Sequence, residues 1–181
     1  RIIMLIALAG CSSVPAMTAA RLVAVDPLTA DPGQIELAVV LPPGISPQPG
    51  TAKLTLHAAG GGQVLEAGYA LVARVAAQDV PLPAGARALA YGLSPSDAVR
   101  MRELQAEVAG WRASGERGQV ALGVGLGGCR LGAGPAPDAE GAVYIRLADD
   151  GGFLPLVGPA PLSDMLGSAA LAGLPPCGAA R

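Results

Sequence analysis

Short segments in which apolar and polar residues alternate recur along the chain and predict that it folds mainly as β-strands. In the segment 34–41, QIELAVVL, the residues Ile35, Leu37 and Val39 fall on one face of a strand. Three glycines at 60–62 separate two alternating segments, which we therefore expect to pair as a hairpin. The further segments with this pattern are 51–58, 63–75, 86–93, 118–129, 142–148 and 153–158.

The spacing of apolar residues changes between positions 94 and 115, where it predicts the one clear helix of the chain. Ser94 is a typical N-cap, Pro95 suits the first helical position, and Gly115 suits the end of a helix. A shorter helix is expected at 162–171. The apolar stripe that we expect to pack against a sheet consists of Ala98, Met101, Leu104, Val108 and Trp111.

Six or seven short strands with one inserted amphipathic helix near 95–113 predict a mainly β fold. We expect an antiparallel β-sandwich, of which the immunoglobulin-like arrangement is one form. The cysteine and tryptophan spacing of true immunoglobulin domains is absent, and the alternative is an α+β fold in which the helix covers one face of a sheet. In either case we expect a single β-rich domain at 21–181, since this length suffices for one hydrophobic core.

An apolar run, 2–9, ends abruptly at a glycine and a cysteine. Eight helical residues span about 12 Å and cannot cross a bilayer core of about 30 Å, so we interpret the run as part of a secretory signal. The tetrapeptide Leu8-Ala9-Gly10-Cys11 resembles the lipobox of bacterial lipoproteins. The resemblance implies cleavage before Cys11, a diacylglycerol on its thiol and an acyl group such as palmitate on its new amino group.

The lipobox also implies a division of the N-terminal region and a location. Residues 1–10 are then the signal peptide, and 11–20 are the lipidated cysteine and a tether of mostly small residues. Ser12 and Ser13 follow the cysteine where an aspartate would retain a lipoprotein at the inner membrane in enterobacteria-like sorting. We therefore expect a chain that is lipid-anchored in the bacterial cell envelope, at the outer membrane and facing the periplasm. Two or more acyl chains provide stable anchoring, whereas one does not.

Two further cysteines, Cys129 and Cys177, remain for a disulfide. Pairs of cysteines in exported domains are commonly oxidised, which favours this bond over two free thiols. The disulfide would tie the C-terminal segment LPPCGAAR back to the body of the domain.

The distribution of charge argues against binding to nucleic acid. The formal net charge is −2, only 14% of residues are charged, and the eleven arginines and one lysine are scattered singly. Nucleic-acid binding requires a cluster of positive charge, so we expect no such partner.

Candidate cofactor and metal sites are weak in this sequence. The spacing of Gly123, Gly125 and Gly128 matches a dinucleotide-binding fingerprint, but the sequence that follows, CRLGAGPAPD, cannot begin the helix that the motif requires. We interpret these glycines as the flat face of a strand and expect no cofactor. His57, the single histidine, lies on the polar side of its segment beside Lys53 and Thr55, which predicts an exposed residue rather than a zinc ligand or a triad member.

Two carboxylate pairs are the remaining candidates for catalysis. Asp149 and Asp150 are adjacent, and Asp138 lies near Glu140. Glycine and proline surround both pairs, which indicates turns. A hydrolase site built from His57, Asp149 and Asp150 is the rival hypothesis, but we expect no enzyme, no catalytic residue and no metal.

The function that we expect is therefore a binding or structural role towards another component of the envelope. An unpaired sheet edge is the usual way in which such a domain takes a protein partner. The alternative is a module that binds a lipid or another small apolar ligand between sheet and helix. Among site residues, these hypotheses name Cys11 for lipidation and Cys129 and Cys177 for the disulfide.

Overall fold

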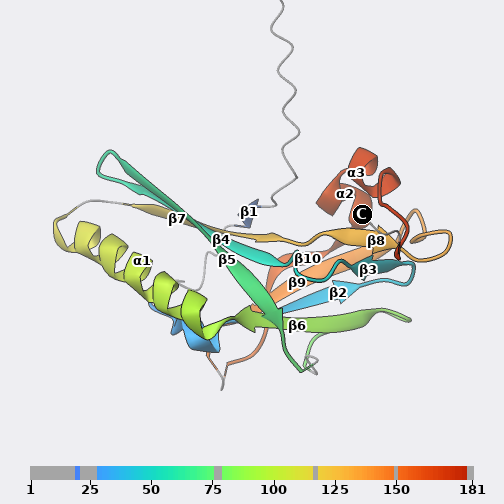
Figure 1. Cartoon of the computed structure of the whole chain (residues 1–181), viewed down its shortest axis with the longest axis horizontal. Helices are drawn as coiled ribbons and strands as arrows, with labels where there is room; N and C mark the ends of the chain where they lie inside the picture. The colour runs from blue at the N-terminus through green and yellow to red at the C-terminus, as the bar shows by residue number, and fades with distance from the viewer. Residues whose placement is uncertain (1–18, 21–27, 76–78, 116–117, 149–150, 179–181) are drawn as a thin grey trace, which may run out of the picture.

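The computed structural model describes residues 19–20, 28–75, 79–115, 118–148 and 151–178, and these ranges fold mainly as antiparallel strands (Figure 1). The longest helix is α1, Pro95–Ala113, and two short helices, α2 (Leu162–Leu166) and α3 (Ser168–Ala172), follow the last strand. A short 3₁₀ helix, Pro32–Gln34, precedes β2. The strands are β1 (Ala19–Ala20), β2 (Glu36–Leu41), β3 (Ile45–Pro47), β4 (Lys53–Gly60), β5 (Gln63–Ala73), β6 (Arg87–Leu93), β7 (Gln119–Gly125), β8 (Gly128–Arg130), β9 (Glu140–Arg146) and β10 (Leu154–Pro161).

The described strands form one large curled sheet in the order β1-β7-β4-β5-β6-β2-β9-β10, and β3 pairs with β8 in a small second sheet. The mainly β, antiparallel prediction with one inserted helix at 95–113 is confirmed. Figure 1 shows α1 at one end of the molecule and α2 and α3 at the other, with the strands running between them.

The two sheets of the predicted sandwich are continuous in the structure, because one long strand, β5, belongs to both. β5 pairs with β4 through Gln63–Ala70 and with β6 only through Leu71–Ala73. One half of the sheet, β7-β4-β5, therefore continues into the other, β6-β2-β9-β10, and strand twist curls the whole. The expected sandwich is thus one sheet folded over on itself.

Alternating apolar residues from both halves of the sheet meet in one core. The faces predicted for 34–41 and 51–58 are correct, since Leu37 and Val39 from β2 and Leu54 and Leu56 from β4 are all buried. In addition, His57 is exposed, as predicted for the polar side of β4. The hairpin is also confirmed, with β4 and β5 paired from Gly60 and Gln63 at the turn outwards.

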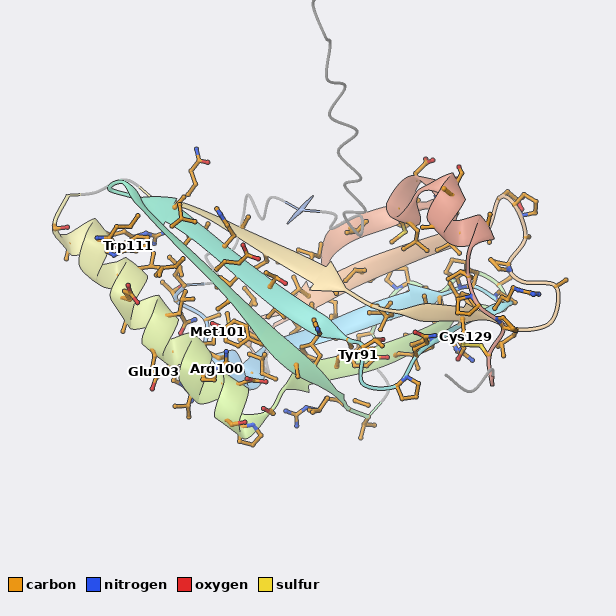
Figure 2. The ribbon with its side chains drawn as sticks, turned by 45° about the horizontal axis from the view of Figure 1, so that its top comes forward. Tyr91, Arg100, Met101, Glu103, Trp111 and Cys129 are labelled. Atoms are coloured by element: carbon orange, nitrogen blue, oxygen red, sulfur yellow. A yellow bond between two sulfur atoms is a disulfide. The ribbon has the colours of Figure 1, made fainter. Side chains whose placement is uncertain are left out.

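Helix α1 begins where the sequence predicts and packs its apolar stripe on this core. The Ser94 hydroxyl accepts a hydrogen bond from the backbone N–H of Asp97, 3.1 Å away, which caps the helix. The Asp97 carboxylate in turn accepts from the backbone N–H of Ala70 at 3.1 Å and so ties α1 to β5. Met101, labelled in Figure 2, is fully buried between the helix and the sheet.

Two predicted elements are each divided in the structure. The segment 118–129 forms β7 and β8 because its pairing with β4 ends at Gly125. Beyond that point the Gly127 carbonyl accepts a hydrogen bond from the backbone N–H of Gln48 at 2.8 Å. The predicted helix at 162–171 is broken into α2 and α3 at Gly167, where φ is 83°. Glycine adopts this left-handed conformation without strain, whereas an α-helix cannot continue through it.

Candidate functional site

A mostly apolar cavity of about 410 Å³ lies at the end of the molecule that carries α2 and α3. Its size is within the range of about 300–1,000 Å³ that is usual for small-molecule sites. The wall includes Leu156 and Val157 of β10. It also includes 39–41 of β2, 45–47 of β3, 124–126 at the end of β7, Gly128 of β8 and 141–143 of β9.

The C-terminal segment 162–174, which we call the C-terminal cover, forms another wall of this cavity. Leu162, Met165 and Leu166 line the cavity from α2, and Ala170 and Leu174 line it from α3 and the residues that follow. Met165 and Leu166 follow Leu162 by three and four residues, so all three lie on one face of a single helical turn. An apolar helical face thus covers the open end of the curled sheet.

Backbone bonds and the disulfide hold the C-terminal cover in place. Cys129 of β8 and Cys177 form the predicted disulfide, with their Cα atoms 4.9 Å apart. Beside it, the Arg130 N–H donates to the Pro175 carbonyl at 2.8 Å, and the Cys177 N–H donates to the Arg130 carbonyl at 2.9 Å. Figure 2 shows Cys129 at the end of the molecule opposite Trp111. The cover is therefore attached at both ends, by β10 and by β8.

Few polar side chains line the cavity. Among the described lining residues, Lys53 is the only charged one, and Ser46 and Thr55 add hydroxyl groups. Lys53 is also exposed, so it lies where the cavity meets solvent. Arg87 touches the same wall, since its guanidinium donates to the Ile45 carbonyl at 3.1 Å and to the Ser46 hydroxyl at 3.0 Å. The chemistry of this site is apolar contact with positive charge near the opening.

A second cavity, of about 270 Å³, lies beside the first. It shares Val40, Gly141 and Ala142 with the larger cavity, and its other lining residues include Tyr144 and Glu140. Tyr144 itself is buried in a small core with Val80.

The sequence-predicted catalytic candidates are not brought together in the described residues. His57 is exposed on β4, Asp138 is exposed in a loop, and Glu140 begins β9. Asp149 and Asp150 lie outside the described residues, as does Cys11. The glycine fingerprint spans β7 and β8, and a strand rather than a helix begins at Gly128.

Neither a metal-binding cluster nor a membrane-spanning helix occurs in the described ranges. These ranges contain no group of three or more histidine, cysteine, aspartate or glutamate residues that could hold a metal ion. No helix within them is both long and apolar enough to span a membrane.

Two ion pairs outside the cavity connect different elements of the fold. Arg146 bonds to Glu36 between β9 and β2, and Arg102 of α1 bonds to Asp31 at 2.6 Å. The pKa of Asp31 is lowered because the Gly33 N–H and then Arg102 donate hydrogen bonds to its carboxylate. Burial raises the pKa of Tyr69 in the core beneath α1. These charges support the fold and leave the cavity apolar.

The alternative predicted from the sequence, an apolar ligand between sheet and helix, refers to the helix at 94–115. No residue of α1 lines the cavity, and the C-terminal cover lies there instead. The signal available in the sequence was the apolar spacing of Leu162, Met165 and Leu166, followed by a cysteine that ties the segment down.

Comparison with known proteins gives no further guide to this site. No protein-family model matches the chain, and neither a curated protein nor a solved structure matches it.

Proposed function

We propose that this chain is an exported, lipid-anchored protein of the bacterial envelope that binds the apolar part of a lipid-like molecule in the cavity beneath its C-terminal cover. The observation that carries the proposal is the cavity itself, about 410 Å³ in volume and lined almost entirely by aliphatic side chains and glycine. Lys53, Ser46 and Thr55 are the only polar side chains among the described lining residues, so we favour binding over catalysis.

The size of the cavity suits one hydrocarbon chain. A methylene group takes up much the same volume as a water molecule, about 30 Å³, so the cavity holds roughly a dozen methylene groups. Each buried methylene contributes about 0.8 kcal/mol, and only the excess over the entropic cost of association appears as affinity. A dozen methylene groups are therefore enough for measurable binding.

The disulfide supports export to an oxidising compartment, because such bonds persist in the periplasm and are rare in the cytosol. Export is what the lipobox resemblance at Leu8-Ala9-Gly10-Cys11 implies. An anchor at Cys11 would hold the binding domain beside a membrane, where amphiphilic molecules are concentrated.

The binding role towards an envelope protein, which the sequence predicts, finds little support at the β10 edge of the described sheet. β10 is the edge strand beside β9, and it contains Pro155, Pro159 and Pro161. Proline has no backbone N–H to donate, so this edge is poorly suited to pairing with a partner strand. We therefore favour the apolar ligand.

Photo-crosslinking in cells tests the cavity directly. Bacteria that express the full chain are fed a long-chain fatty acid that carries a diazirine in its acyl chain, and crosslinked peptides are mapped by mass spectrometry after irradiation. We expect crosslinks to the lining residues of the C-terminal cover and of β2, because these side chains surround the bound chain. Crosslinks confined to α1, or none, would contradict the proposal.

Metabolic labelling tests the anchor independently. Cells that grow with an alkyne-bearing palmitate should label the wild-type chain and not the Cys11→Ala variant, because the resemblance places the lipid on Cys11. Cys129→Ala is the matched control and should stay labelled, since Cys129 is occupied by the disulfide. Label retained in Cys11→Ala would refute the lipobox interpretation.

A further inference from the structure

The single lysine of the chain lies at the opening of the apolar cavity. Lys53 is the only charged residue among the described ones that line it, and its side chain is exposed. In the described part of the chain Lys53 forms no ion pair, whereas Arg100, Arg102 and Arg146 each bond to a carboxylate. Among the described residues the Lys53 ammonium thus has no counter-ion, and it is available to a ligand.

The surroundings of the opening reinforce its positive character. Arg87 bonds to the lining residue Ser46 and to the Ile45 carbonyl, neither of which neutralises its charge. Thr55, two positions along β4 from Lys53, adds a hydroxyl to the same wall. The described lining contains no carboxylate, so no lining side chain would repel an anionic group near Lys53.

We infer that the ligand is an amphiphile with one acyl chain and an anionic headgroup, such as a carboxylate or a phosphate, and that the headgroup lies at Lys53 while the chain fills the cavity. This inference rests on the proposed function and specifies its ligand. The volume limits the cavity to about one chain, and the charge selects the headgroup. Complementary charge at the rim of an apolar site mainly provides specificity.

A matched set of photoreactive probes tests the headgroup. Three compounds carry the same diazirine-labelled fourteen-carbon chain and end in a carboxylate, an alcohol or a trimethylammonium group. The full chain is reconstituted in vesicles of phosphatidylcholine, and crosslinking to the cavity lining is measured for the wild type and for Lys53→Met. The ratio of variant to wild type cancels the partition of each probe into the bilayer.

We expect Lys53→Met to lower crosslinking of the carboxylate about fivefold, which is the typical limit for a solvent-exposed ion pair. Crosslinking of the alcohol should not change, and that of the trimethylammonium probe should rise. Lys53→Arg should restore the carboxylate signal, because it keeps the charge. The matched control Arg102→Met removes a positive charge from α1, outside the cavity, and should change none of the three ratios.

The outcomes separate this inference from the proposed function. Equal crosslinking of the three probes in the cavity, unchanged by Lys53→Met, would overturn the anionic headgroup and leave the apolar site intact. Failure of all three probes to label the cavity would overturn both.

A spectroscopic measurement supplies a second readout. Reductive methylation with ¹³C-formaldehyde labels Lys53 as the single lysine of the chain. Its dimethylamine resonance, identified by its absence in Lys53→Arg, should shift when tetradecanoate is added and not when tetradecanol is added. If the chemical shift of this resonance did not change with tetradecanoate, the placement of the headgroup at Lys53 would be contradicted.

Discussion

Removing the disulfide between Cys129 and Cys177 is expected to lower the free energy of unfolding by about 4 kcal/mol. The bond closes a loop with a sequence separation of 48 residues, and cross-linking a loop of this length restricts the unfolded chain strongly. For a protein of this size, such a change lowers Tm by roughly 8–16 °C.

Removing the disulfide should also affect ligand binding, because the disulfide lies beside the C-terminal cover. Without it, the C-terminal cover remains attached through β10 and through the backbone hydrogen bonds between Arg130 and residues 175 and 177. Each backbone hydrogen bond contributes only about 1 kcal/mol, so these bonds hold the segment less firmly than the covalent bond does. We therefore expect weaker binding in the cavity as well as lower stability.

Urea denaturation of the full chain in a nonionic detergent, followed by circular dichroism, measures the stability change. The double variant Cys129→Ala/Cys177→Ala is compared with the wild type before and after reduction. Reduction should destabilise the wild type to the level of the variant and leave the variant unchanged. A difference below about 1 kcal/mol would show that the C-terminal cover is held by its other contacts alone.

Gly125→Trp is expected to block the cavity and to reduce ligand binding at least a hundredfold. Gly125 lines the cavity at the end of β7 and pairs with Lys53 of β4, and a Cβ atom there would meet no other atom within 4 Å. An indole ring excludes about five methylene groups, each worth about 0.8 kcal/mol of binding. The fold should tolerate the change, because aromatic residues favour strands.

The matched control is Gly158→Trp. Gly158 lies in β10, is exposed, has open space around an added Cβ atom, and does not line the cavity. The Gly158→Trp variant should crosslink to the photoreactive fatty acid to the same extent as the wild type. Gly128→Leu blocks the cavity from another wall, since its Cβ would lie 3.4 Å from Ile45 and 3.5 Å from Leu174. If both blocking variants, folded by circular dichroism, bound the fatty acid normally, the cavity could not be its site.

Local sequence patterns predict the strands, the start of the long helix and the disulfide of this protein. Alternation predicted the strands and their buried faces because a strand repeats every two residues, as Leu54 and Leu56 show on β4. The N-cap at Ser94 predicted the start of α1 for an equally local reason. The number of cysteines favoured the disulfide, and the polar face of β4 predicted the exposure of His57.

How these elements enclose a cavity depends instead on contacts between segments that are distant in the sequence. One curled sheet forms because β5 changes partner from β4 to β6 along its length, which its own alternation does not reveal. The cavity depends on contacts between distant segments, such as Val40 of β2 with Ala142 of β9, and on the cover at 162–174. Local patterns state which side of each element is apolar. Which apolar sides meet, and what volume they leave unfilled, depends on how the whole chain packs.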